Sequence, residues 1–170
     1  MIERPKPEYR SGIGTDIHRL VEGRKLILGG VHVEYPAGLA GHSDGDVALH
    51  AIIDALLGAA AMGDIGTLFP DTDPKYKDAD SKELLVIVKE MLEEKDWEIA
   101  NVDLVIHIEQ PRLEPVKGQI KRCIASLLGI DFTTVNVKAK TNEGLGDIGA
   151  GDAIAATAVT LLKKRFRRTL

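Results

Sequence analysis

The sequence predicts an α/β fold, an α+β sandwich in which helices pack on one face of a mixed β-sheet. Hydrophobic residues make up 44% of the 170 residues but aromatic residues only 4%, so the core must consist mainly of Ile, Leu, Val and Ala. Strand-like and helix-like patterns alternate along the chain, and no internal repeat or long linker interrupts them. We therefore expect a single domain over residues 12–170, preceded by a flexible lead-in at residues 1–11 that contains two prolines.

The first elements are predicted from hydrophobic periodicity and from the turn and cap residues that bound each segment. Residues 12–20 read as a strand, and residues 25–36 as a hairpin with Gly29-Gly30 at the turn. Residues 46–62 are rich in Ala and Leu and predict a helix that ends near Gly63. Ser43, Asp44 and Asp46 are all plausible N-cap or first-turn residues for this helix.

The second half of the chain continues the alternation. An amphipathic helix is expected over residues 81–97, with Ser81 as its cap, followed by a strand that ends near Pro111. A helix with Gly129 as its C-cap precedes an alternating strand over residues 134–140. A glycine-rich loop then leads into a final helix over residues 153–166.

Composition excludes several classes of protein. The net charge of −4 weighs against a broad electrostatic interface with nucleic acid. The single cysteine, Cys123, rules out a disulfide framework within the chain and a zinc site made of several thiolates. No apolar run reaches the roughly 20 residues that span a bilayer, so no membrane partner is expected. Without a signal or transit peptide, we expect a bacterial-type cytoplasmic protein, or a plastid protein whose transit peptide has been removed.

A set of Asp and His residues predicts a metal site. Asp16 and His18 share one face of a strand because successive side chains alternate. On the following helix, Asp46, His50 and Asp54 form one polar row. Asp16, His18 and His50 make a sensible zinc set with one position left open, since catalytic zinc commonly takes three nitrogen or oxygen ligands.

The spacing alone leaves an alternative open for these residues. His50 could be a buried histidine with satisfied hydrogen bonds, and Asp16 an exposed turn residue, because Asp-x-His is common by chance. In the metal-site interpretation, Asp46 or Asp54 would orient the ring of His50 from outside the coordination shell.

Two polar segments point to phosphate. The segment "GHSDG", with His42 and Ser43, offers donors at a helix N-terminus, where anions bind readily. In "KAKTNEGLG", Lys138, Lys140 and Thr141 lie where a strand enters the glycine-rich loop, and Glu143 could hold a second, hard cation. A polar turn with a cap is the alternative for the second segment.

Four segments together resemble the 2-C-methyl-D-erythritol 2,4-cyclodiphosphate synthases. They are "TDIHRL", "GHSDGDVALHAIIDALLGAAAMGDIGTLFPDTDP", "NVDLVIHIEQPRLEP" and "VNVKAKTNEGLG", in the family's order, and the resemblance as a whole runs from about residue 13 to residue 162. The resemblance implies a lyase of the non-mevalonate isoprenoid pathway. It would convert 4-diphosphocytidyl-2-C-methyl-D-erythritol 2-phosphate to the 2,4-cyclodiphosphate with release of CMP. It also implies a homotrimer whose sheets face a central cavity and whose active sites lie between subunits.

The resemblance assigns roles to residues of this chain. Zn²⁺ would be bound by Asp16, His18 and His50, and the second metal, Mg²⁺ or Mn²⁺, by Glu143, while His42 and Thr141 would stabilise the transition state. The metal ligands, His42 and Thr141 would also contact the substrate, together with the residues that follow: Ser43, Asp64, Ile65, Gly66, Phe69, Pro70, Asp71, Thr72, Asp73, Ile108, Pro111, Arg112, Leu113, Glu114, Ala139, Lys140 and Asn142.

The chain departs from the family pattern after "GLG". The family usually has Phe-x-Gly-Arg there, whereas this chain has "DIGAGDA", with Asp147 and Ala150. The usual arginine is thought to bind an isoprenoid diphosphate in the trimer cavity, so we expect weak or absent binding of such an effector. The segment "IEQPRLE" also differs from the family, with Arg112 in place of the usual lysine.

Two other functions remain to be weighed against cyclisation. A zinc-dependent phosphoester hydrolase would use a metal-bound water and release a linear product. A non-catalytic trimeric scaffold would hold a structural zinc, which usually has a fourth protein ligand, and His42 is the nearest candidate for it.

Overall fold

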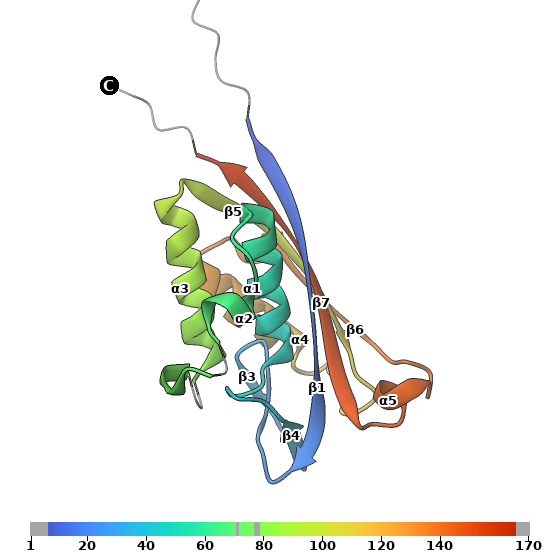
Figure 1. Cartoon of the computed structure of the whole chain (residues 1–170). Helices are drawn as coiled ribbons and strands as arrows, with labels where there is room; N and C mark the ends of the chain where they lie inside the picture. The colour runs from blue at the N-terminus through green and yellow to red at the C-terminus, as the bar shows by residue number, and fades with distance from the viewer. Residues whose placement is uncertain (1–6, 71, 77–78, 166–170) are drawn as a thin grey trace, which may run out of the picture.

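The computed structural model describes residues 7–70, 72–76 and 79–165. Its centre is a five-stranded sheet with the strand order β4-β1-β7-β5-β6 (Figure 1). The strands are β1 (Tyr9–Glu22), β4 (Ala37–Leu39), β5 (Trp97–His107), β6 (Val135–Lys140) and β7 (Ala153–Lys164). β5 and β6 are parallel, whereas β7 runs antiparallel to both β1 and β5, so the sheet is mixed as the sequence predicts.

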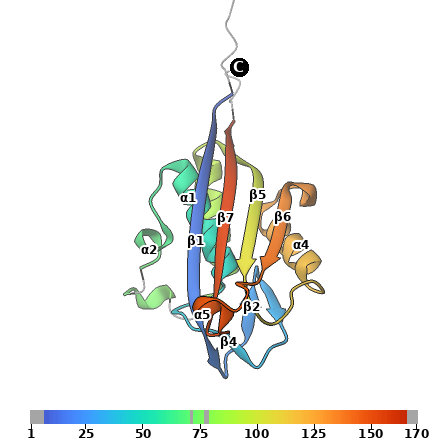
Figure 2. The ribbon, with the colours of Figure 1, turned by 90° about the vertical axis from the view of Figure 1, so that its right-hand side faces the viewer.

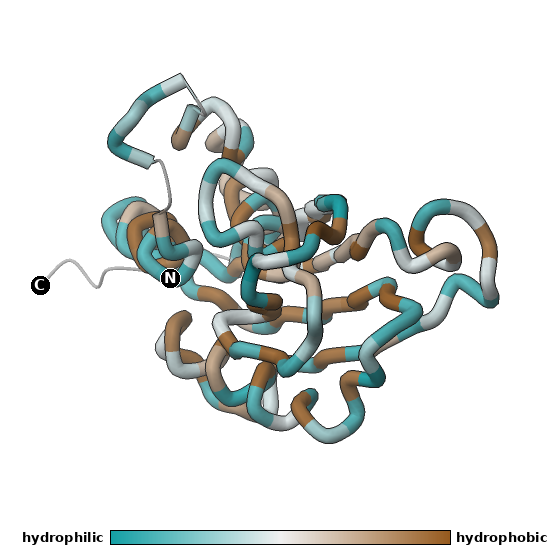
Figure 3. The backbone as a smooth tube through the Cα atoms, turned by 90° about the horizontal axis from the view of Figure 1, so that it is seen from below, coloured by the Kyte–Doolittle hydropathy of each residue, from teal (hydrophilic) through white to brown (hydrophobic). Residues whose placement is uncertain are grey.

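The long helices cover one face of this sheet. They are α1 (Val47–Ala60), α3 (Ser81–Glu94) and α4 (Lys117–Leu128). The buried core lies between them and the strands, and α1 contributes a nearly continuous buried surface from Val47 to Ala60. Hydrophobic and hydrophilic residues intermingle along the elements in Figure 3, as expected where each element has one buried side. The described parts of the chain contain no helix of the length and hydrophobicity needed to cross a membrane.

The remaining elements are short. The expected hairpin is present as β2 (Leu26–Leu28) and β3 (Val31–Val33), and both glycines of its turn have positive φ. The connections also contain single turns of helix, which are α2 (Ile65–Leu68), η1 (Pro74–Tyr76), η2 (Phe132–Thr134) and α5 (Gly146–Gly149).

The helix expected over residues 153–166 is wrong, because residues 153–164 form the central strand β7, while residue 166 lies outside the described part. Its even-numbered residues face the helices and are buried, from Ile154 to Leu162. The alanines that suggested a helix are small enough to let α1 lie close to the sheet. Pairing with β1 on one side and β5 on the other overrides the local helical preference.

Several boundaries also differ from expectation. β1 begins at Tyr9, so residues 9–11 belong to the sheet, while residues 1–6 lie outside the described part. Asp80, not Ser81, is the N-cap of α3, and its carboxylate accepts from the N–H of Lys82 at 2.9 Å. The N-cap Asp46 of α1 and the C-cap Gly129 of α4 are confirmed.

The sheet face away from the helices is bare over most of its length (Figure 2). Its exposed side chains include large apolar residues, since Ile13, Ile17 and Val159 have exposed fractions of 66%, 58% and 44%. Ile13 and Val159 are directly paired between β1 and β7. An exposed apolar sheet face of this kind is typical of a surface that binds another protein chain.

Candidate metal centre and adjoining pockets

The β1 strand brings two ligand types to the helix side of the sheet. Gly12, Gly14, Asp16 and His18 alternate with outward-facing residues and so point toward α1. A Cβ atom on Gly14 would lie 2.1 Å from the carbonyl oxygen of Ala51, so only glycine permits α1 to pack so closely. The glycines before the ligands thus let α1 lie against the strand from Ala51 to Ala59.

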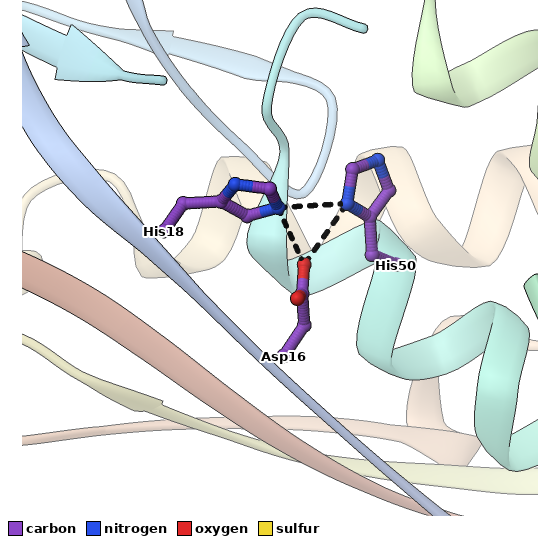
Figure 4. Close-up of side chains that lie close together, drawn as sticks. All are labelled: Asp16, His18 and His50. Atoms are coloured by element: carbon purple, nitrogen blue, oxygen red, sulfur yellow. Dashed lines mark hydrogen bonds and ion pairs between the residues drawn. The ribbon is translucent and has the colours of Figure 1, made fainter. Parts of the chain in front are cut away.

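His50 projects from α1 to complete a triad with Asp16 and His18 (Figure 4). The Oδ2 atom of Asp16 lies 2.8 Å from His18 Nε2 and 2.9 Å from His50 Nδ1, and the two nitrogens are 3.3 Å apart. Among the described residues, this is the one group of His, Cys, Asp and Glu whose ligand atoms all lie within 4.8 Å of one another.

The geometry of the triad fits a metal ion. Two ligand atoms about 2.0–2.1 Å from a tetrahedral zinc ion lie about 3.3 Å apart. The distance between the two histidine nitrogens, 3.3 Å, is the same, and those to the carboxylate are slightly shorter. Two imidazoles and one carboxylate are the ligand chemistry of a site that keeps a position open.

The electrostatics of the site also suit a cation. Burial alone would raise the pKa of Asp16, but hydrogen bonds with His18 and His50 outweigh burial and hold this pKa below its usual range. Asp16 is therefore ionised at neutral pH. A metal ion could take the place of the protons in its hydrogen bonds with His18 and His50.

The other ring nitrogen of His50 faces two hydroxyl groups. Nε2 lies 2.9 Å from Ser81 Oγ and 3.2 Å from Ser43 Oγ. The expectation that Asp46 or Asp54 orients His50 is wrong. The carboxylate of Asp46 caps α1, and that of Asp54 accepts from the N–H of Ile65 at 2.7 Å.

Ser81 is the site residue that sequence reasoning missed. The sequence pattern predicts only a helix cap at this residue, which lies 31 positions after His50 in the chain. The available signal was the start of α3 itself, because polar groups gather at a helix N-terminus. Nothing in the local pattern indicated that this helix end would face the metal ligands.

A cavity of about 260 Å³ opens beside the triad. It brings together eight of the expected site residues, namely Asp16, His18, His42, Ser43, His50, Ile65, Gly66 and Phe69. Tyr76 and Leu84 contribute apolar side chains to the wall of this cavity. The rings of Phe69 and Tyr76 pack edge to face, with their centroids 5.2 Å apart. The pocket thus combines ligand atoms with an apolar wall.

The remaining residues expected near this pocket belong to the connection between α1 and α3. Asp64 is exposed and caps α2 through the N–H of Thr67 at 2.7 Å. Pro70, Thr72 and Asp73 follow α2, and Asp71 lies outside the described residues.

Arg24 anchors the backbone of the loop that carries His42 and Ser43. Its guanidinium donates to the carbonyl oxygen of Ser43 at 2.7 Å and to that of Gly41 at 3.3 Å. Two charge-assisted hydrogen bonds from one side chain fix the loop backbone, so the hydroxyl and imidazole of the loop are presented toward the cavity.

A second pocket of about 350 Å³ lies at the ends of β5 and β6. It is lined by the expected residues Ile108, Pro111, Arg112, Leu113, Glu114, Ala139, Lys140 and Thr141, together with Glu109 and Gln110. Thr141 Oγ1 donates to Glu143 at 2.6 Å, and the N–H of Asn142 donates to Glu109 at 3.1 Å. These eight residues, all expected to contact the substrate, therefore lie together in one pocket.

The two pockets share no lining residue. The first lies beside β1 and α1, and the second at β5 and β6, on the other side of β7 in the strand order. The chain therefore has two separate pockets, one on each side of β7 in the strand order.

These features define a class of protein: an α/β protein with a His₂Asp metal-binding triad in a pocket. Residues 9–163 match the model of the YgbB family. A 2-C-methyl-D-erythritol 2,4-cyclodiphosphate synthase of Treponema denticola is 53% identical over 153 residues, which cover 90% of this chain and 95% of that relative.

Solved structures give the same result. The chain is similar to the bifunctional IspDF from Campylobacter jejuni, with a TM-score of 0.91 and 42% identity over 95% of this chain, and it spans 44% of that longer protein. A 2C-methyl-D-erythritol-2,4-cyclodiphosphate synthase in its CDP-bound form has a TM-score of 0.83 and 38% identity, with 90% of this chain and 99% of that one covered. The chain belongs to the YgbB family.

Proposed function

We propose that this chain is a cyclodiphosphate synthase. It converts 4-diphosphocytidyl-2-C-methyl-D-erythritol 2-phosphate to 2-C-methyl-D-erythritol 2,4-cyclodiphosphate and CMP. The observation that carries the proposal is the triad of Asp16, His18 and His50 beside His42 and Ser43, in a chain of the YgbB family. The proposal places the enzyme in the non-mevalonate pathway of a bacterial-type cytoplasm.

The reaction needs no protein nucleophile. An oxygen of the substrate's own 2-phosphate bonds to the β-phosphorus, and the bond from that phosphorus to the bridging oxygen breaks, so that CMP leaves with the bridging oxygen. When bound, Zn²⁺ and a second ion, Mg²⁺ or Mn²⁺, neutralise phosphate charge that would otherwise oppose the attack. Asp16, His18 and His50 would hold the zinc, and Glu143 the second ion.

The side chains of the protein position the two phosphates and stabilise the transition state. His42 and Ser43 line the triad pocket, where they would contact phosphate oxygens. Thr141 at the second pocket would act with His42 in stabilising the transition state. Holding the two phosphates in line can supply much of the rate, since a well-oriented intramolecular reaction gains about 7–11 kcal/mol.

Substrate recognition is divided between the two pockets. The methylerythritol part would bind near Asp64, Ile65 and Gly66 under the segment from Phe69 to Asp73. The cytidine part would bind at residues 108–114 and 139–142. Support for this division comes from the second pocket and from the similar synthase that was solved with CDP.

A complete site would require two subunits, because the pockets lie on different sides of β7. A homotrimer whose sheets face one another would join the triad pocket of one subunit to the second pocket of its neighbour. It would also cover the apolar side chains of Ile13, Ile17 and Val159.

The decisive experiment follows a single turnover by phosphorus NMR with Zn²⁺ and Mg²⁺ present. CMP together with a cyclic diphosphate is expected, and His50→Ala should lower the rate by more than about 100-fold, since even loss of an outer partner costs about 10–100-fold. CMP with a linear diphosphate would indicate the hydrolase. No turnover by a zinc-loaded trimer would favour the scaffold.

The trimer has its own test. Ile13→Glu places a charge on the apolar sheet face, and burying an unpaired charge is costly. We expect this variant to elute as a monomer and to lose turnover but to bind zinc normally, because the triad is complete within one chain. A fully active trimeric variant would place the interface elsewhere.

A further inference from the structure

The N-terminus of α3 contributes a buried chain of hydrogen bonds to the triad. Ser81 is fully buried, and its Oγ lies 2.9 Å from His50 Nε2. The same hydroxyl donates to Asp44 Oδ1 at 2.5 Å, and the backbone N–H of Ser81 donates to Asp44 Oδ2 at 3.2 Å. Both oxygens of Asp44 therefore accept from this serine, and Oδ1 also accepts from the N–H of Asp46 at 3.1 Å.

This arrangement determines which nitrogen of His50 carries the proton once a metal is bound. A serine hydroxyl has one proton to donate, and Ser81 Oγ donates it to Asp44 Oδ1. The remaining lone pairs of Ser81 Oγ can only accept, so the shorter of the two hydroxyl contacts of Nε2 is a hydrogen bond only when Nε2 of His50 is the donor. Nδ1, which faces Asp16 and His18, is then left with its lone pair for a metal.

We propose that Asp44 and Ser81 are positioning residues that fix the ring orientation and the tautomer of His50 for metal binding. The inference rests on the proposed function, because it assumes that the triad holds zinc. It gives a role to the second residue of the segment "SDGD", which the substrate and metal assignments leave unused.

Two further contacts show that the arrangement is built into the fold. The N–H of Asp44 donates to the carbonyl oxygen of Ala79 at 3.1 Å, which fastens the loop before α1 to the segment before α3. Ser43 Oγ, at 3.2 Å from Nε2, is the longer of the two hydroxyl contacts and also accepts from the N–H of Gly45. Ser43 would therefore replace Ser81 only in part.

The test measures zinc affinity, not turnover. The dissociation constant of zinc is determined by competition with a chromophoric chelator for the full-length wild type, Ser81→Ala and Asp44→Asn. Loss of an outer partner of a metal-bound histidine costs about 10–100-fold in affinity, and we expect a loss in this range for Ser81→Ala. Asp44→Asn should also bind more weakly, since an amide cannot accept with both of its terminal atoms.

A matched control separates positioning from damage to the helix end. Asp80→Ala removes the N-cap of α3 and its bond to Lys82, but leaves Asp44, Ser81 and His50 in place. We expect its zinc affinity to stay within about twofold of wild type, since no contact of His50 changes. Equal losses in Asp80→Ala and Ser81→Ala would overturn the proposal, because the role of Ser81 would then be structural.

Proton NMR of the zinc-loaded protein gives a direct readout. Wild type should show a slowly exchanging Nε2–H proton on His50, and Ser81→Ala should shift this signal and speed its exchange. An unchanged signal with unchanged zinc affinity would overturn the positioning role while leaving the proposed function intact. A wild-type protein that binds no zinc would instead overturn the metal site of the proposed function, and this inference with it.

Discussion

The two pockets of this chain are built in different ways. At the triad pocket, His50 and Ser43 are each 8% exposed and are held by hydrogen bonds from separate elements. At the second pocket, Arg112, Glu114 and Lys140 are exposed. Side chains that must hold an ion at fixed distances are thus rigidly supported within one chain. Those of the second pocket are exposed, and under the proposed function they would contact a substrate at a neighbouring subunit.

The comparison predicts that removing one carboxylate lowers the free energy of unfolding much more in the first region than in the second. The side chain of Asp46 is fully buried and accepts from the backbone N–H groups of Gly29, Gly30, Ala48 and Leu49. A buried donor left without an acceptor costs about 1–3 kcal/mol, so Asp46→Ala should lower the free energy of unfolding by about 3–5 kcal/mol. Denaturant titration measures this loss.

The matched deletion in the second region is Glu109→Ala. Glu109 accepts a single backbone hydrogen bond, from Asn142, near the surface. We expect the free energy of unfolding to fall by only about 1 kcal/mol or less. Comparable losses in the two variants would show that the regions are equally rigid and would remove the basis of the comparison.

The second prediction concerns pH and the same buried carboxylate. Complete burial raises the pKa of Asp46 from 3.8 to about 6, although hydrogen bonds from Gly30, Gly29 and Leu49 act in the opposite direction. The folded state therefore binds this proton more tightly than the unfolded state does. The resulting stabilisation is complete below about pH 4 and is lost as the pH rises through about 6.

The expected size of this change is about 2–3 kcal/mol, since one pKa unit corresponds to about 1.36 kcal/mol. It is measured as the difference between wild type and Asp46→Asn in denaturant titrations from pH 4 to pH 7. Asn keeps a capping oxygen but does not titrate, so this contribution to the pH dependence should vanish. Parallel curves for the two proteins would contradict the assignment to Asp46.

The triad was predictable because it depends on local periodicity. Asp16 and His18 share a face through the two-residue period of a strand, and the glycines at positions 12 and 14 mark where the helix approaches. His50 follows from the helical period of α1. Each ligand could therefore be inferred from its own segment, without knowledge of the sheet order.

The features that were missed depend on contacts between distant segments. Residues 153–164 form a central strand because β1 and β5 pair with them on both sides, which no local pattern reveals. Ser81 contacts His50 only because α3 packs beside α1. The carboxylate of Asp46 accepts from the N–H groups of the hairpin turn and not from His50. Local propensity is a weak guide where long-range pairing decides the outcome.

The third prediction tests whether Glu109 organises the second pocket. Its hydrogen bond to the N–H of Asn142 fixes the start of the loop that carries Thr141 and Glu143. We expect Glu109→Ala to weaken CDP binding by about three- to tenfold, which corresponds to the loss of one hydrogen bond of about 1 kcal/mol. Isothermal titration calorimetry gives the affinity. Glu109→Gln keeps an acceptor oxygen and should bind CDP nearly as well as wild type.

The smallest expected change in stability is at Glu143. This residue has a φ of 52°, in the left-handed region that favours glycine, and it accepts from Thr141 Oγ1 at 2.6 Å. Replacing it with glycine relieves about 1–2 kcal/mol of backbone strain but increases the entropy of the unfolded chain. The two effects nearly cancel, so Glu143→Gly should change the free energy of unfolding by less than about 1 kcal/mol.

The functional effect of the same variant should be much larger than its effect on stability. If Glu143 holds the second divalent ion, Glu143→Gly should require far more Mg²⁺ for turnover while binding zinc as wild type does. Titrations of turnover with Mg²⁺ at saturating zinc measure this difference, and Glu143→Gln separates loss of charge from the change in backbone. An unchanged Mg²⁺ requirement in both variants would exclude the carboxylate as a ligand. A strained residue retained in an exposed loop, where glycine would fit without cost, is best explained by the chemistry of its side chain.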